Sequence, residues 1–486
     1  MNILFIHSID DIYTPEKPLR TPEQMLFGIS YISALLKRHG HRTKLTVLSR
    51  ILGKKNYKMI DDRLKEFCPK LICFAAVSTE YKFISGAAKY IKGRYPDIYL
   101  VIGGPHVSLN AEDILSDAFD ALCIGEGEYP TLELASQLEE GMRPLGIPNL
   151  WIKNDLGVEK NAPRRVLQDL DSLPFPDREM WDEWIDEEEG SRYPVLLGRG
   201  CPFQCTYCCN HALRKIAGGP YVRFRSPENI VKEIEEFAAR FPDKKAIYLE
   251  VETIGADRKW AERLCSKLEG LNAALDEPLN FGVNLRIAPN IDFDSLFAAF
   301  KKSNFKIINI GVESGSERVR KEILNRNYSN KDIINTVSLA RKYGLKVHFY
   351  NLIGVPGETA DDFKETLGIN RVCAPDKSYT HIFYPYPGTE LYSTCIKQGL
   401  LRDAPDTELE RCKAVLDLPG FSKRQIQNGF IWFDYHIYRG RRPIYRILPK
   451  VFVSQCRSNS HVHSLYRRFT YSIFFKGMKR LLKRYV

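Results

Sequence analysis

Short apolar runs alternate with amphipathic stretches along the first 145 residues. The apolar runs predict strands, and apolar residues that recur every three or four positions predict helices. The predicted strands are 3–6, 71–76, 99–102 and 121–124, and the predicted helices are 24–38, 82–94, 111–116 and 129–140. Strands that alternate with helices in this way form parallel sheets covered on both faces. We therefore predict an α/β fold with a Rossmann-like, doubly wound parallel sheet over residues 1–145.

The same alternation continues from residue 193 to about residue 392. Six strand–helix units are predicted, with strands 193–197, 246–251, 279–283, 306–312, 346–353 and 378–384, and helices 227–240, 258–268, 294–302, 317–324, 330–342 and 361–370. Residues 146–190 mix prolines, turn residues and charges, and they predict an extended linker. We expect a second α/β domain over 191–400 and a mainly helical, basic region over 401–486.

The charge of the chain is concentrated at its end. The 71 Lys and Arg against 60 Asp and Glu give a net charge of +11. Residues 420–486 contain 15 of the basic residues and one acid, a local charge of +14, which leaves 56 bases and 59 acids, a charge of −3, for the rest. A charge of this sign attracts nucleic acid, an anionic membrane surface or an acidic substrate. Because most of the chain is nearly neutral, the pattern argues against nucleic-acid binding by the whole protein.

Composition favours a cytoplasmic protein. The first residues lack the basic start and apolar run of a signal peptide, and no run of about 18 apolar residues predicts a spanning helix. The 12 cysteines are too few for a disulfide scaffold. In a reducing compartment, clustered cysteines more often bind metal.

Glycine-rich segments follow the third and fourth predicted strands. They read Gly103-Gly104-Pro105-His106 and Gly125-Glu126-Gly127-Glu128. Glycine lets the backbone approach a ligand closely at the carboxyl end of a parallel sheet, although the same residues can simply turn the chain. No G-x-G-x-x-G follows the first strand, so the dinucleotide fingerprint is absent.

Three cysteines share a short loop after the strand predicted at 193–197. Cys201, Cys205 and Cys208 form a C-x-x-x-C-x-x-C pattern. Three thiolates at this spacing can hold one soft-metal centre and leave a coordination position open. A structural zinc site completed by Cys209 or His211 is the alternative. The other cysteines are scattered and predict no second cluster.

The cysteine loop resembles the signature of the radical S-adenosylmethionine superfamily, including the aromatic Tyr207 before the last cysteine. The resemblance implies a partial (β/α)6 barrel in which the three cysteines hold a 4Fe–4S cluster. S-adenosylmethionine would chelate the fourth iron and be cleaved reductively to a 5′-deoxyadenosyl radical.

The same resemblance assigns polar residues after the barrel strands to S-adenosylmethionine. Glu252 would accept hydrogen bonds from the methionyl ammonium, with Glu250 as the alternate and a solvated strand end as the simpler interpretation. The remaining candidates are Asn284, Arg286, Glu313, Ser314 and Arg326. Arg326 can equally be an ordinary helix-end arginine.

The two glycine-rich segments resemble the cobalamin-binding domain at the front of many radical enzymes. The resemblance implies that Gly103, Gly104, His106, Gly125, Glu126 and Gly127 contact cobalamin. No D-x-H-x-x-G motif supplies a histidine to cobalt. Cobalamin without a histidine ligand, and a domain that has lost cobalamin, both remain open.

The basic end of the chain allows three interpretations. Apolar residues within 473–482 alternate with Lys and Arg within 476–484, as in an interfacial helix beside an anionic bilayer. Packing against the barrel and nucleic-acid binding are the alternatives.

The favoured function is cobalamin-dependent methylation of an unactivated carbon or phosphorus of a small-molecule or lipid-like substrate. The resemblance also implies a one-electron donor of the flavodoxin or ferredoxin type. One alternative is radical rearrangement, cyclisation or carbon–carbon bond formation without cobalamin. The other is a non-enzymatic, metal-stabilised binding module. We expect a cytoplasmic enzyme, peripheral to the membrane if the basic tail docks there.

Overall fold

The computed structural model describes residues 1–10, 12–14, 16–187, 190–289, 292–401, 407, 409–459 and 462. The chain divides into two compact units. The first comprises residues 1–203, 208–251 and 386–389, and the second comprises 204–207, 252–385 and 390–486. The domain boundaries inferred from sequence stay a prediction beside this division.

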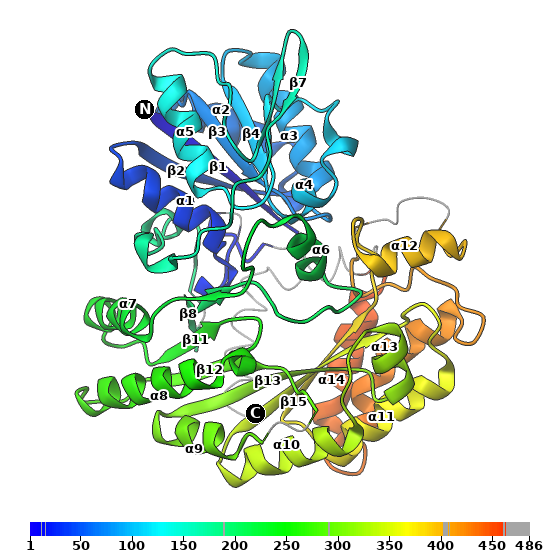
Figure 1. Ribbon diagram of the computed structural model, residues 1–486. Helices are drawn as coiled ribbons and strands as arrows, with labels where there is room; N and C mark the ends of the chain where they lie inside the picture. The colour runs from blue at the N-terminus through cyan, green and yellow to red at the C-terminus, as the bar shows by residue number, and fades with distance from the viewer. Residues whose placement is uncertain are drawn as a thin grey trace. The chain divides into compact units, whose positions relative to one another are not determined.

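The first unit contains a seven-stranded sheet in the order β2-β1-β3-β4-β5-β6-β7 (Figure 1). The strands from β1 to β5 pair in parallel. They are β1 Asn2–Ile9, β2 Arg42–Ser49, β3 Leu71–Ala75, β4 Tyr99–Gly103 and β5 Ala121–Cys123. The strands β6 Leu150–Asn154 and β7 Gly157–Lys160 add an antiparallel hairpin to the β5 edge.

Helices cover both faces of this sheet, which makes it doubly wound. α1 Phe27–Arg38 and α5 Glu128–Glu139 pack together on one face (Figure 1). α2 Lys55–Phe67 and α3 Tyr81–Arg94 pack into a separate core on the other face. Neighbouring residues of β4 supply both cores, Val101 one and Leu100 the other, because successive side chains of a strand point to opposite faces.

The N-terminal prediction is confirmed as a doubly wound sheet, with local differences. The sequence pattern missed β2, α2 and the antiparallel hairpin, which lies inside the region expected to be an extended linker. The helix predicted over 111–116 is only a turn of 3₁₀ helix, Glu112–Ile114, preceded by the short helix α4 Pro105–Leu109.

The second sheet has six strands in the order β15-β14-β13-β12-β11-β8. The strands are β8 Tyr193–Leu196, β11 Ala246–Glu250, β12 Asn280–Leu285, β13 Phe305–Glu313, β14 Lys346–Ile353 and β15 Lys377–Ile382. The pairings β8–β11, β12–β13, β13–β14 and β14–β15 are parallel. A two-stranded antiparallel ribbon, β9 Gly198–Arg199 with β10 Arg223–Phe224, accompanies this sheet.

Each strand of the second sheet is followed along the chain by a helix or a helical turn, and α12 Glu390–Lys397 follows the last strand. The helices are α6 Cys209–Ile216, α7 Pro227–Arg240, α8 Arg258–Ala273, α9 Asp294–Lys302, α10 Asn330–Lys342 and α11 Ala360–Cys373. α8, α9, α10 and α11 lie in succession along the second unit (Figure 1). The helix predicted over 317–324 is a π-turn, Val319–Ile323. The six strand–helix units are therefore confirmed.

The C-terminal region is helical where the structure describes it. It contains α12 Glu390–Lys397, α13 Lys423–Tyr438 and α14 Ile444–Arg457. α13 and α14 share an apolar core with the ends of β14 and β15. The stretch 473–484, predicted as an interfacial helix, lies outside the described residues. Among the helices that the structure describes, none has the length and apolar character needed to cross a membrane.

Candidate functional site

The three cysteines lie between two fixed structural elements. The ribbon strand β9 ends at Arg199, and α6 begins at Cys209. Gly200 adopts a φ of +83°, and a Cβ on it would collide with the carbonyl oxygen of Tyr221. Only glycine fits there, so the entrance to the loop is fixed by the backbone. Cys205 is buried and Cys201 and Cys208 are half-buried, and all 12 cysteines of the chain are free of disulfides.

The predicted residue Arg286 reaches the cysteine loop within the second unit. Its Nη1 lies 2.6 Å from the Sγ of Cys205 and donates a hydrogen bond to it. The backbone N–H of Arg286 donates to the Oγ1 of the buried Thr253 at 2.9 Å. Arg286 thus brings a guanidinium donor to the Sγ of one of the three predicted cluster ligands.

Arg326 makes a second connection to the same loop. Its Nη2 donates to the hydroxyl of Tyr207 at 2.8 Å and lies 3.0 Å from Oε1 of Glu313. Its Nη1 donates to the carbonyl of Gly311 at 2.6 Å. Burial opposes the charge of Arg326, but the nearby Tyr207 and Glu313 outweigh it, and the pKa is raised well above its ordinary value. Arg326 is a buried, paired cation here and not a solvated helix-end arginine.

Glu313 owes its position to an unusual backbone conformation at the end of β13. The β13–β14 register shifts between Gly311 and Glu313, and Glu313 has a φ of +61°. A non-glycine residue in this region carries strain, and such residues concentrate at functional sites. The kink places the Glu313 carboxylate beside the guanidinium of Arg326.

Two backbone contacts that the sequence pattern did not indicate also hold the cysteine loop. Thr206 donates from Oγ1 to the carbonyl of Ile323 at 2.6 Å, and Asn325 donates from Nδ2 to the carbonyl of Gln204 at 2.9 Å. Both partners lie in the segment after β13 that begins with the π-turn. π-Turns are frequent at functional sites, but no residue pattern in the sequence predicts them.

The other residues predicted to contact S-adenosylmethionine differ in their surroundings. The Oδ1 of Asn284 accepts from Asn309 at 3.3 Å. Ser314 is fully buried, and its Oγ accepts from the backbone of Ser316 at 3.2 Å. Glu252 is exposed after β11. Ser314 thus has a structural task already, and its predicted contact would have to come from the neighbouring backbone.

The glycine-rich segments lie at the carboxyl ends of β4 and β5. Gly104 has a φ of +108°, and a Cβ there would come 2.7 Å from the carbonyl oxygen of Ala76. Close strand packing therefore requires this glycine. Gly103, Gly125 and Gly127 accompany it, with φ +88° at Gly125. His106 faces Ser78, with 3.1 Å between Nδ1 and the hydroxyl oxygen, and burial lowers its pKa.

Glu126 has a different set of partners from the one predicted. Arg223 binds both of its carboxylate oxygens, at 2.9 and 3.1 Å, and Arg199 binds one at 3.2 Å. The backbone N–H of Leu167 donates to it at 3.0 Å. Arg199 also binds Glu128 at 2.5 Å. All of these residues belong to the first unit, where they form an ion network next to the cysteine loop.

Two family models match separate parts of the chain. The model of the B12 binding domain matches residues 25–135, and that of the Radical SAM superfamily matches residues 195–368. The second match contains the cysteine loop, Arg286 and Arg326, and the first contains both glycine-rich segments.

The chain is a radical SAM enzyme with a B12-binding domain.

Relatives of this radical SAM enzyme share both parts. An uncharacterised methyltransferase of Pyrococcus horikoshii is 25% identical over 405 residues, which cover 82% of this chain and 84% of the relative. The cytidylyl-2-hydroxyethylphosphonate methyltransferase of Streptomyces wedmorensis is 22% identical over 458 residues, 81% of this chain and 82% of that enzyme. The methyltransferase TsrM of Kitasatospora setae, solved with cobalamin and a 4Fe–4S cluster, matches the fold with a TM-score of 0.64 at 17% identity, over 83% of this chain and 76% of TsrM.

The family assignment implies three cofactors, which are the 4Fe–4S cluster, S-adenosylmethionine and cobalamin. It also makes the chain an enzyme, so the alternative of a non-enzymatic binding module is wrong.

The residues present fit the cluster by their chemistry. Among the described residues, no three His, Cys, Asp or Glu side chains are gathered closely enough to hold a metal ion without further movement. The loop nevertheless offers three thiols that form no disulfide within eight residues, with guanidinium groups bonded to Cys205 and to Tyr207. Metal binding and the ordering of its ligands are commonly coupled. We therefore take the donor set as suited to the cluster.

The glycine-rich segments of the radical SAM enzyme fit a flat cofactor such as cobalamin. They bring backbone rather than bulky side chains to the carboxyl edge of the first sheet, where α/β folds bind ligands. The side chain of Glu126, in contrast, is committed to arginines.

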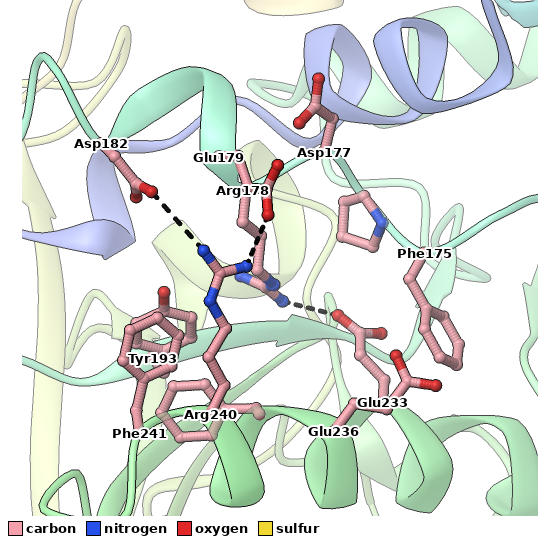
Figure 2. Close-up of a pocket in the computed structure, with 12 residues that line it drawn as sticks. Phe175, Asp177, Arg178, Glu179, Asp182, Tyr193, Glu233, Glu236, Arg240 and Phe241 are labelled. Carbon is pink, nitrogen blue, oxygen red and sulfur yellow. Dashed lines mark hydrogen bonds and ion pairs between the residues drawn. The ribbon is translucent and has the colours of Figure 1, made fainter. Parts of the chain in front are cut away.

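A hollow of about 230 Å³ in the first unit has no connection to these residues. It lies between residues 175–182 and α7 (Figure 2). The charged side chains that line it are largely paired, as Figure 2 shows. Arg178 forms an ion pair with Glu233 at 2.6 Å, and Arg240 forms one with Glu179 at 2.9 Å. None of the predicted cofactor-contacting residues lines it, and we assign it no role.

Proposed function

We propose that this radical SAM enzyme catalyses cobalamin-dependent methylation of an unactivated carbon, or phosphorus, of a small-molecule or lipid-like substrate. The observation that carries the proposal is the bonding of Arg286 and Arg326 to the cysteine loop. It links residues after β12 and β13 to the loop, in a chain that also has a B12-binding domain. The names of the Pyrococcus and Streptomyces relatives and of TsrM support methyl transfer.

The loop cysteines and the two arginines have proposed tasks. Cys201, Cys205 and Cys208 hold the cluster, and Arg286 positions the Sγ of Cys205 through its hydrogen bond. When bound, the cluster supplies the electron that cleaves S-adenosylmethionine, and cobalamin carries the methyl group. Arg326 faces the methionyl carboxylate, because it is a buried cation whose Nε has no hydrogen-bond partner among the described residues.

The acidic and amide residues complete the proposed site for S-adenosylmethionine. Glu313 fixes the orientation of the Arg326 guanidinium through its ion pair at 3.0 Å. The exposed Glu252 accepts from the methionyl ammonium, and Asn284 contacts the ribose or carboxylate. These assignments rest on position after the strands and on charge.

The proposed setting follows from the chemistry of the site. A reducing cytoplasm suits 12 cysteines without a disulfide. We propose an acidic one-electron donor of the flavodoxin or ferredoxin type as a partner. We also propose that the basic C-terminal region brings the enzyme to a membrane surface.

Anaerobic reconstitution tests the function directly. Protein loaded with cluster and cobalamin is reduced with S-adenosylmethionine, and 5′-deoxyadenosine and methylcobalamin are measured. We expect both products. Alanine at any of the three loop cysteines should abolish 5′-deoxyadenosine, whereas Cys209→Ala should retain it. 5′-Deoxyadenosine without bound cobalamin or methylcobalamin would refute methyl transfer and favour rearrangement or ring closure.

A further inference from the structure

The helix α14 presents an apolar face that the rest of the described chain leaves exposed. Ile444, Leu448 and Phe452 are 51%, 46% and 63% exposed, and Tyr445 beside them is 65% exposed. Residues spaced by four positions lie along one face of a helix. Four large apolar side chains are thus exposed within nine residues, a density that marks an interaction surface and not ordinary surface scatter.

Other residues of the same helix attach it to the rest of the protein. Ile447 and Val451 are buried against the core shared by α13 and the ends of β14 and β15, and Cys456 is buried as well. A substitution on the exposed face therefore need not disturb the buried one.

Basic side chains accompany the exposed face. Arg446, Lys450 and Arg457 share another face of α14, with spacings of four and seven residues, and Arg441 and Arg442 precede the helix. From 420 to 459, Asp434 is the one acid, and its carboxylate is paired with Lys450 at 3.4 Å. The chain continues through residues 460–486 with seven further Lys and Arg and no acid.

We infer that α14 is a docking surface for an anionic lipid bilayer. The helix would lie in the interface, with Ile444, Leu448 and Phe452 among the acyl chains and the arginines at the lipid phosphates. A helix that combines an apolar face with Lys and Arg as its only charged residues binds membranes by buried apolar area and by charge together. An acidic protein would match the charge but not the aliphatic face, and RNA would leave that face in water.

This inference is independent of the chemistry proposed for the enzyme. Vesicle binding is measured on the full chain without a turnover assay. A failed methyl-transfer test therefore says nothing against membrane docking, and a failed vesicle-binding test says nothing against methyl transfer.

Vesicle co-sedimentation of the full chain tests the surface. We expect binding to phosphatidylcholine vesicles that contain an anionic phospholipid, and little binding to phosphatidylcholine alone. The variant Leu448→Ser/Phe452→Ser should lower the partition coefficient at least tenfold, about 1.4 kcal/mol. The matched control Val372→Ser/Ile396→Ser removes two apolar side chains that are 59% and 49% exposed on other helices, and it should bind as the wild type does.

Charge is tested separately with Arg446→Glu/Arg457→Glu, which should weaken binding to anionic vesicles and reduce its salt dependence. Circular dichroism of each variant shows whether it is folded, so loss of binding in a folded variant supports the surface. Three results would overturn the inference: no binding to anionic vesicles, equal binding by wild type and the Leu448→Ser/Phe452→Ser variant, or a dimer of the free protein that this variant dissociates. Release from vesicles by competing RNA at equal charge would favour nucleic acid instead.

Discussion

The carboxylate of Glu126 joins two arginines that the fold places directly opposite each other. Arg199 and Arg223 are cross-strand partners in the ribbon β9–β10. Like charges at such positions destabilise a strand pair. Glu126 neutralises them by binding Arg223 through both oxygens and Arg199 through one. We predict that Glu126→Gln, which keeps the shape and removes the charge, destabilises the first unit.

The magnitude follows from burial. The side chain of Arg223 is 4% exposed, that of Arg199 17% and that of Glu126 24%. Removing one partner of a buried ion pair costs about 3–5 kcal/mol. Because Glu126 is partly exposed and Glu128 still binds Arg199, we take the lower value, about 3 kcal/mol. For a unit of about 250 residues this lowers Tm by roughly 6–12 °C.

Thermal unfolding followed by tryptophan fluorescence measures the effect, since Trp151, Trp181 and Trp184 lie in the first unit. The control is Glu133→Gln. Glu133 also binds an arginine through both oxygens, at 2.9 Å each, but is 42% exposed. An exposed pair contributes about 1 kcal/mol at most, so the control should lose under about 4 °C.

The pH dependence gives a second check. Burial alone would raise the pKa of Glu126, but the bonds from Arg223 and the charges of both arginines lower it below its ordinary value of 4.5. A lowered pKa in the folded state means that the stabilisation is present above the unfolded pKa and disappears as pH falls through the folded one. The difference between wild type and Glu126→Gln should therefore shrink below pH 4.5. An equal loss of stability in Glu126→Gln and Glu133→Gln at neutral pH would refute the stabilising role of the network. Loss of cobalamin binding in Glu126→Gln at unchanged Tm would instead make Glu126 a cofactor contact.

Three further predictions concern the second unit and the loop. Alanine at any of the three loop cysteines should reduce iron after reconstitution to background, while Cys209→Ala keeps it; equal iron in all variants would contradict the assignment. Arg326→Lys should weaken S-adenosylmethionine binding at least tenfold in equilibrium dialysis at unchanged iron content, because lysine cannot reproduce the paired guanidinium contacts; unchanged affinity would remove Arg326 from the site. Burial raises the pKa of Glu358 to about 8, although two backbone N–H groups oppose the shift. The folded state then retains a proton that the unfolded state loses, so wild-type stability should fall from pH 5 to pH 8. Glu358→Gln should lack that decline. The Tm of both proteins is measured from pH 5 to pH 8, and an equal fall in Tm for the two proteins would contradict the prediction.

Regular elements were predictable wherever the local pattern was strong. The bounds of α7, α9, α10 and β14 agree with those predicted, because their apolar spacing and their Ser, Pro or Gly ends are local signals. β2 and the β6–β7 hairpin were missed. The hairpin carries alternating, half-exposed residues at a sheet edge, and such residues give a weak apolar signal.

The candidate site also has one part that was predictable from the sequence and another part that was not. Cys201, Cys205 and Cys208 follow from spacing alone, since the whole pattern lies within eight neighbouring residues. The link from Arg286 to Cys205 crosses 81 residues, and the link from Arg326 to Tyr207 crosses 119. No local pattern contains such contacts, because they depend on the order of strands in the sheet.

The sequence by itself determined the alternation of strands and helices, the cysteine loop and the position of the basic charge, because each is a property of neighbouring residues. Only the tertiary structure decided that Glu126 neutralises a pair of arginines, that Glu313 occupies a strained bulge beside Arg326, and that α14 exposes one apolar face while burying another. These outcomes depend on which distant side chains desolvate one another, and that is fixed when the sheets and helices pack.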